Sequence, residues 1–402
     1  MAVLLVGTLD TKGVEFQFVR DLLHAAGVEC LVLDAGVLNP PSFEPDISRA
    51  DVYAAAGTSI NAVRNAGDRG RAIAAAAKGA TAIASRLHRE GKISGVLGLG
   101  GSAGTTIATA TMRELPFGVP KLMVSTLASG QVRPYVGVRD IMMMYSVVDI
   151  SGINRISRTV LTNAANAMVG MTQGSGVRGQ GSEDKRLITA TMFGVTTPCV
   201  ERARAVIEAE GYEVLVFHAT GTGGQTMEAF IRDGLISGVL DVTTTELADE
   251  RVGGILSAGP DRLTAAALTG VPQVIGLGAL DMVNFGPPET VPAKFADRRL
   301  YQHNPTVTLM RTTPDENDQI GKEIAHKASA AKGPTAVYVP LRGLSALDRE
   351  GGAFWWPEAD NALFESLRLW MSPHVKLIEL DMHINDAAFA EAMAMGLLGM
   401  LK

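Results

Sequence analysis

The sequence has few of the residues on which several common functions depend. Aromatic residues make up only 5% of the 402 residues, so base-stacking surfaces for nucleic acid are not expected. The 36 lysines and arginines are outnumbered by 42 aspartates and glutamates, and a net charge of −6 gives no electrostatic reason to bind nucleic acid. Cys30 and Cys199 are too few for a disulfide framework or a cysteine metal site. The sequence therefore predicts no nucleic-acid partner.

Signals for membrane insertion and for several enzyme classes are also missing. No apolar run approaches the ~18 residues that span a bilayer, and the chain start lacks the basic region of a secretory signal, which predicts a cytoplasmic protein. The phosphate-binding motif that ends in Gly-Lys-Ser or Gly-Lys-Thr is absent. No histidine pair has zinc-site spacing, so no metal ligands are predicted, and no Gly-x-Ser-x-Gly turn predicts a serine hydrolase.

The first 36 residues predict one unit of a parallel sheet. The apolar run Ala2–Val6 is typical of a strand buried on both faces, and a polar turn at 7–13 follows it. Apolar residues at helical spacing predict a helix over Val14–Ala26, and Gly27 ends it in the position that often needs a positive φ. A second strand is predicted over Val28–Leu33. Strand, helix and strand in this order imply parallel pairing.

Three segments of the first half recur in the same order in the second half. The pairs are Gly27–Glu29 with Gly211–Glu213, Gly91–Leu97 with Gly234–Leu240, and Gly118–Lys121 with Gly270–Gln273. Matches in one order predict an internal duplication. The predicted fold class is therefore α/β, with two tandem Rossmann-like domains, each a doubly wound parallel sheet.

The spacing of these repeats also predicts the domain limits. An N-terminal domain over residues 1–176 and a C-terminal domain over 184–402 are joined by the glycine-rich, polar segment 173–185. The first domain carries an insertion of roughly residues 43–86, whose alanine-rich end predicts a helix over 67–87.

The strongest candidate for ligand binding is the glycine-rich turn within 93–106, where a strand runs into a helix. Such a turn brings the backbone close to a ligand, and the helix N-terminus favours an anion. The turn at 7–13 and the residues after the strand 121–124 should reach the same sheet edge. The residues predicted to bind a phosphate or carboxylate ligand at this edge are Gly7, Thr8, Asp10, Thr11, Lys12, Gly98, Gly100, Gly101, Ser102, Gly104, Thr105, Ser125 and Thr126.

Other interpretations of these turns stay open. The glycines could serve only the packing of a tight turn, and Asp10 and Thr11 could only cap a helix. The turn fits the dinucleotide fingerprint loosely at Gly98, Gly100 and Ala103, but no clear acidic residue follows at the distance needed to hold a ribose. An NAD(P)-dependent oxidoreductase is therefore disfavoured.

The second domain differs at the equivalent turns. Asp241 and Thr243 stand where the first domain has Gly98 and Gly100, while the segment 218–225 resembles a second anion cradle with a histidine at its edge. The long polar segment 279–311 contains four prolines, which exclude a long helix and favour a functional loop.

Acid–base chemistry is predicted for this domain from a small set of side chains. Asn284 is expected to converge with them on a cleft that faces the first domain's phosphate loop. The predicted catalytic residues are His218, Asp281, His303 and Arg311.

Five motifs give the chain a resemblance to a known family. They are GTLDTKG at 7–13, GLGGSAGT at 98–105, DMVNFG at 281–286, HNP at 303–305 and LMRTT at 309–313. Together they resemble the family of the ATP-binding domain of the tomato mosaic virus resistance protein, whose bacterial members are uncharacterised. The resemblance covers essentially the whole chain. It implies two Rossmann-like domains in tandem, ATP or a related nucleotide bound by the first domain at 7–13 and 98–105, and a homodimer or larger assembly.

Two function classes follow from the residues and the resemblance. The first is a nucleotide-binding protein whose ATP, with or without Mg²⁺, is structural or regulatory and whose reaction is unknown. The alternative is an enzyme that acts on a small phosphorylated or carboxylated substrate with the histidine and aspartate groups of the second domain. The sequence leaves open whether the protein is an enzyme.

Overall fold

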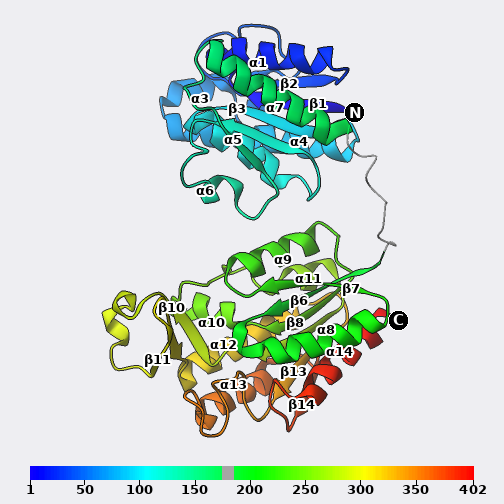
Figure 1. Cartoon of the computed structure of the whole chain (residues 1–402), viewed down its shortest axis with the longest axis vertical. Coiled ribbons are helices and arrows are strands. Elements are labelled where there is room, and N and C mark those ends of the chain that lie inside the picture. The colour runs from blue at the N-terminus through cyan, green and yellow to red at the C-terminus, as the bar shows by residue number, and fades with distance from the viewer. Residues whose placement is uncertain (174–184) are drawn as a thin grey trace. The chain divides into compact units, whose positions relative to one another are not determined.

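The computed structural model describes residues 1–173 and 185–402, and the predicted linker therefore lies almost entirely outside the described residues. The chain forms two compact units, Met1–Gly181 and Ser182–Lys402, which are called the first and second domain below (Figure 1).

The first domain is a five-stranded parallel sheet between two layers of helices. The strand order is β2-β1-β3-β4-β5, and every pairing in this sheet is parallel. Its elements are β1 (Ala2–Gly7), α1 (Leu9–Ala25), β2 (Cys30–Asp34), α2 (Arg49–Ala55), α3 (Ile60–Ala66), α4 (Arg69–Arg89), β3 (Ile93–Gly100), α5 (Ser102–Glu114), β4 (Lys121–Ser125), α6 (Arg133–Val136), β5 (Met142–Tyr145) and α7 (Arg155–Gln173).

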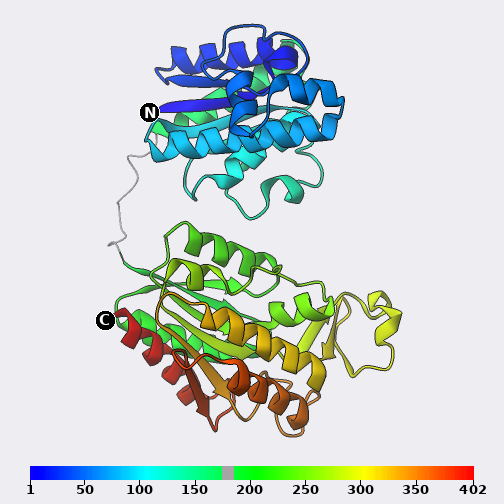
Figure 2. The same cartoon turned by 180° about the vertical axis from the view of Figure 1, so that it is seen from behind.

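Alternate residues of the strands feed two separate cores. Val3 and Leu5 pack with α1 and α7 on one face, which is the face seen in Figure 1. Leu4 and Val6 pack with α2, α4 and α5 on the other face, along which α4 runs in Figure 2. Strands buried on both faces need continuous apolar runs, which explains why the sequence pattern identified them.

The second domain contains a six-stranded parallel sheet of order β14-β13-β9-β8-β6-β7 and a small antiparallel sheet of order β10-β12-β11. Helices α8 and α14 share one core, and α10, α12 and α13 share another. Its helices and strands are β6 (Leu187–Met192), α8 (Thr197–Ala209), β7 (Glu213–His218), α9 (Thr222–Arg232), β8 (Gly238–Thr243), α10 (Thr245–Val252), α11 (Ala265–Thr269), β9 (Gln273–Gly278), β10 (Met282–Phe285), β11 (Leu300–Asn304), β12 (Val307–Arg311), α12 (Pro314–Ser329), β13 (Thr335–Pro340), α13 (Pro357–Trp370), β14 (Lys376–Leu380) and α14 (Ala387–Leu401).

The two sheets have the same topology, as the internal duplication predicts. The order β2-β1-β3-β4-β5 of the first domain corresponds to β7-β6-β8-β9-β13 of the second, with β14 added at the edge. The register agrees as well: Val96 pairs with Lys121, and Val239, its counterpart in the repeat, pairs with Gln273. Gly27 and Gly211 both follow the first helix with positive φ, 75° and 88°.

Two local expectations were wrong, and a third, the alanine-rich helix, was confirmed with its bounds shifted by two residues. The segment 7–13 is mostly helix, because Thr8 is the N-cap of α1 and the helix begins at Leu9. The alanine-rich helix extends over Arg69–Arg89 rather than 67–87. The segment 279–311 is not a single long loop but contains β10, β11 and β12, in which Met282 pairs with Arg311.

Candidate functional site

A cavity of about 470 Å³ opens in the first domain at the carboxyl ends of β1 and β2. Thr8 follows β1, Ala35 follows β2, and Ala103 lies in the first turn of α5, which follows β3. In the order 2-1-3-4-5 the chain crosses from β2 to β3 over β1, and open sheets bind ligands at such a crossing point. Helices α2, α3 and α4 of the insertion form the remaining walls.

The cavity combines apolar walls with a few charged and hydroxyl groups. Its larger apolar and aromatic side chains are Val37, Leu38, Tyr53, Val63, Ile73 and Ile107. Its polar side chains are Thr8, Asp10, Thr11, Arg64, Asp68 and Arg69. This mixture is typical of sites for small organic ligands, whose few polar groups fix the orientation.

Asp10 and Arg64 hold the loop after β2 from two sides. Oδ2 of Asp10 accepts hydrogen bonds from the backbone N–H groups of Val37 (3.1 Å) and Leu38 (2.8 Å). Arg64 donates to the backbone carbonyls of the same two residues, at 2.6 and 2.9 Å. These two of the four charged side chains on the cavity wall are therefore fixed by the backbone of one loop. Burial raises the pKa of Tyr53 to about 12, so its hydroxyl stays protonated at neutral pH.

The glycine-rich turn at the start of α5 is explained mostly by packing. A Cβ at Gly98 would lie 2.4 Å from Cβ of Ala108, and a Cβ at Gly100 would lie 2.9 Å from Cα of Gly104. Gly101 differs, because the nearest atom to its added Cβ is Oγ1 of Thr126, at an ordinary 3.6 Å. Gly101 is the N-cap of α5 and offers no capping side chain, so the first N–H groups of the helix are free for a ligand.

Replacement of Gly98 by alanine tests the packing role. We expect the free energy of unfolding of the first domain to fall by about 1–3 kcal/mol, because the new methyl group overlaps Ala108 and Met123. Gly101→Ala is the matched control and should change stability by no more than about 0.5 kcal/mol. Urea unfolding measures both. Equal stability of the two variants would contradict the packing role of Gly98.

Several residues predicted to contact a nucleotide have internal partners instead. Thr105 and Ser125 are completely buried, and their hydroxyls form a hydrogen bond of 2.7 Å with each other. Lys12 donates to the carbonyl of Ile150 in the loop after β5 and does not line the cavity. A Cβ at Gly7 would overlap the ring of Phe16, so that glycine serves packing.

Four predicted residues remain at or beside the cavity. Thr8 and Thr11 line it, with their hydroxyls 2.8 Å apart, and Asp10 lines it as described. Ser102 is exposed at the first position of α5. The sequence prediction thus places part of its set at one site, whereas Gly98, Gly100, Gly104, Thr105 and Ser125 are packing residues.

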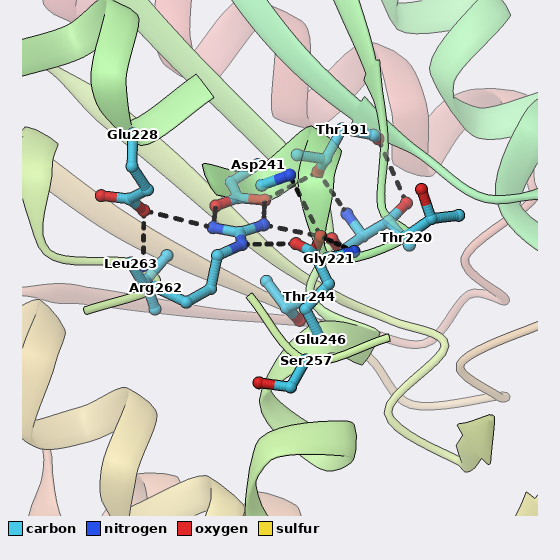
Figure 3. A network of polar contacts seen from close by, with 12 residues as sticks. Thr191, Thr220, Gly221, Glu228, Asp241, Thr244, Glu246, Ser257, Arg262 and Leu263 are labelled. Carbon is cyan, nitrogen blue, oxygen red and sulfur yellow. Dashed lines mark hydrogen bonds and ion pairs between the residues drawn. The ribbon is translucent and has the colours of Figure 1, made fainter. Parts of the chain in front are cut away.

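The predicted second anion cradle, at the N-terminus of α9, is occupied by a side chain of the same domain. Oε1 of Glu246 accepts hydrogen bonds from the backbone N–H groups of Gly221 (2.7 Å) and Gly224 (3.0 Å) (Figure 3). Its other oxygen, Oε2, accepts from Nε of Arg262 at 2.6 Å. Glu246 is completely buried, and burial raises its pKa.

Arg262 lies at the centre of this network. Its guanidinium group is completely buried and forms two hydrogen bonds with Asp241, of 2.5 and 2.7 Å. A third carboxylate, that of Glu228, lies 3.5 Å from Nη1 and also accepts hydrogen bonds from the backbone N–H groups of Leu263 and Ala265. Burial alone would lower the pKa of Arg262, but the charges of Asp241 and Glu246 outweigh it and raise the pKa.

The structure brings together two of the four predicted catalytic residues. Asp281 and Arg311 are completely buried in one cluster with Asp348 and Asp360. Nη2 of Arg311 lies 2.6 Å from Asp360 and 3.8 Å from Asp348, and Asp281 accepts a hydrogen bond of 2.8 Å from Ser345. Since neither Asp281 nor Arg311 has exposed surface, neither side chain is accessible to a ligand in the conformation described.

The other members of the predicted convergence lie elsewhere. Asn284 bonds to Asp249 at 2.7 Å, and burial raises the pKa of Asp249 to about 7. His303 is exposed on β11, and His218 is exposed at the end of β7 with its ring against Phe193. The expectation that Asn284 and the two histidines join Asp281 and Arg311 in one site is therefore wrong. It failed because Met282, next to Asp281, pairs with Arg311, and the side chains of Asp281 and Arg311 are both buried in the core.

Sequence reasoning missed the cavity residues of the insertion, Tyr53, Arg64 and Arg69. One signal could have found them: the insertion follows β2, whose carboxyl end lies at the predicted ligand-binding edge. Within the described residues, no group of three or more histidine, cysteine, aspartate or glutamate side chains could hold a metal ion. Over the same residues, every helix is too short or too polar to cross a membrane.

Comparison with known proteins identifies relatives over the whole chain. Residues 1–176 match the model of the uncharacterised protein family (UPF0261) N-terminal domain, and residues 185–401 match that of its C-terminal domain. A UPF0261 protein from Clostridium tetani is 53% identical over 100% of this chain and 99% of its own length. One from Rhizobium meliloti is 49% identical over 96% of each chain. The ToMV resistance protein Tm-1(GCR237) of Solanum lycopersicum is 44% identical over 81% of this chain. The aligned residues cover 44% of the length of the plant protein.

Proposed function

Because this chain belongs to the UPF0261 family, we propose that it shares the nucleotide binding that its motifs imply and binds ATP or a related nucleotide in the cavity of the first domain. The observation that carries the proposal is the position of the cavity. It lies at the crossing point of the sheet, where the uncapped N-terminus of α5 meets apolar walls. A helix N-terminus favours phosphate, and apolar walls favour a planar base.

The charged residues of the cavity support an anionic ligand with hydroxyl or amino groups. The backbone N–H groups at Ser102 and Ala103 and the hydroxyls of Thr8 and Thr11 are the donors for phosphate in this proposal. Arg69 is exposed at the first position of α4 and supplies a cation at the rim. Asp10 is the acceptor for ribose hydroxyls, or the group nearest a Mg²⁺ ion that accompanies ATP.

Calorimetry of the full chain with ATP tests the proposal. We expect saturable binding to the wild type, and we expect Gly101→Asp to weaken it by at least about tenfold, because a carboxylate at the N-cap of α5 repels phosphate. Gly101→Ala is the control, since its methyl group fits without overlap and brings no charge. Unchanged ATP affinity in a folded Gly101→Asp variant would contradict this site. The absence of ATP binding by the wild type would contradict the proposed function itself.

The alternative, an enzyme acting on a small phosphorylated or carboxylated substrate, stays a prediction. Among the described residues its two histidines are exposed but separate from the buried Asp281 and Arg311. The homodimer that the resemblance implies also stays a prediction.

A further inference from the structure

The internal duplication allows the cavity of the first domain to be compared with the same place in the second. Gly95 pairs with Val3, and Gly238, its counterpart in the repeat, pairs with Ile188. With this register, Ala103 of the first domain corresponds to Glu246. In the same way Asp34, at the end of β2, corresponds to His218 at the end of β7. Val37 therefore corresponds to Gly221.

These equivalent positions are separated in one domain and joined in the other. Ala103 and Val37 line the cavity of about 470 Å³ in the first domain. Their counterparts Glu246 and Gly221 form a direct hydrogen bond of 2.7 Å, from the backbone N–H to Oε1. The side chain of Glu246 thus crosses the place that corresponds to the cavity.

The carboxylate that binds the loop N–H also comes from a different element in each domain. In the first domain, Asp10 of α1 accepts from Val37 and leaves the side of Ala103 open. In the second domain the segment 193–198, between β6 and the second residue of α8, contains no acidic residue. Glu246 of α10 takes that role from the opposite side, and Arg262 holds its second oxygen.

We infer that the second domain has an anion site of the same origin as the cavity and that Glu246 is its permanent, built-in occupant. Two backbone N–H groups and a fully buried guanidinium surround the carboxylate, which is the donor set that a small oxyanion would use. The chain consequently binds ligand in the first domain alone. The inference that only the first domain binds ligand rests on the proposed function, whereas the inference that Glu246 occupies an anion site in the second domain does not.

The inference predicts that the second domain accepts a small oxyanion once the carboxylate is removed. In Glu246→Ala, hydrogen exchange of the peptide that carries the amides of Gly221 and Gly224 should accelerate by at least about tenfold, because two charge-assisted hydrogen bonds are lost. Added sodium formate should restore most of the protection, while sodium chloride at equal ionic strength should not. The wild type should respond to neither salt.

Two further variants separate anion binding from a general effect on folding. Glu246→Gln keeps the volume of the side chain, so formate should not protect it. The double variant Glu246→Ala, Gly224→Ala adds a methyl group beside the position that Oε2 of Glu246 held, since a Cβ at Gly224 would lie 2.2 Å from that atom. We expect formate not to restore protection in this variant. Failure of formate to protect Glu246→Ala, or equal protection of all variants, would overturn the inference. If Glu246→Ala does not fold, recovery of folded protein on refolding with formate but not with chloride gives the same readout.

Calorimetry of the wild type with ATP gives an independent measurement. We expect one site per chain, and two sites per chain would overturn the inference. No ATP binding at all would contradict the proposed function but leave the formate result to decide whether Glu246 occupies an anion site.

Discussion

Replacement of Arg262 by methionine should destabilise the second domain by about 3–5 kcal/mol, because it leaves several buried carboxylates without their cation. Asp241, Glu246 and Glu228 lie within 3.5 Å of the guanidinium, and their side chains are at most 5% exposed. Methionine has a similar length but neither charge nor donors, so the carboxylates must repel one another or take up protons. Urea unfolding, followed by a probe specific to the second domain, measures the loss.

Arg204→Met is the matched control for this experiment. Arg204 forms an ion pair of 2.7 Å with Glu208 on α8, but its side chain is 49% exposed. Exposed pairs of this kind contribute well under about 1 kcal/mol. A loss at Arg262 as small as that at Arg204 would contradict the role of Arg262 in balancing the three buried carboxylates.

The sheets could be predicted from the sequence because their determinants are local. Runs such as Ala2–Gly7 are apolar at every position, as strands buried on both faces must be, and the recurring segment at 93–97 and 236–240 fixed the equivalent third strand in each sheet. The antiparallel sheet β10-β12-β11 was missed, because its strands are short and the pairing of β10 with β12 joins residues far apart in sequence, such as Met282 and Arg311.

The candidate site could be predicted only in part for a related reason. The sequence places Thr8, Asp10 and Thr11 after β1 at a known sheet edge, and all three line the cavity. Whether a polar residue faces a ligand or its own core depends on partners from distant elements. Glu246 is satisfied by Arg262, and Arg311 by Asp360, neither of which a local pattern reveals. The glycines of the turn at 98–104 were ambiguous, since packing and ligand approach both require a missing side chain.

The cluster around Arg311 should make the second domain less stable as the pH rises from about 5.5 to 8.5. Burial and the charge of Asp348 raise the pKa of Asp281 to about 7, although Arg311 opposes the shift. Burial also raises the pKa of Asp360 to about 8. Aspartate in an unfolded chain has a pKa of about 3.9, so across this range the native state binds protons that the unfolded state has released.

The sign of the pH effect follows from this difference in bound protons. For a group whose native pKa is raised, stability is fully present below the unfolded pKa and is lost as the pH rises through the native value. For each proton that the native state holds and the unfolded state has released, the free energy of unfolding falls by about 1.4 kcal/mol per pH unit. Asp249, with its pKa raised to about 7 by burial, acts in the same direction. The loss should level off above the pKa of Asp360.

Urea unfolding of the second domain at pH 5.5, 7.0 and 8.5 measures this dependence, and asparagine variants assign it. Asp281→Asn and Asp360→Asn each remove one titrating carboxyl from the cluster, so each should show a shallower decline than the wild type. Asp381→Asn is the control: Asp381 is exposed, and its hydrogen bond with Arg342 lowers its pKa, so its titration lies below this pH range. Stability that rises with pH over this range, or an unchanged slope in both cluster variants, would show that these carboxyls are already ionised in the native protein, with Arg311 alone balancing them.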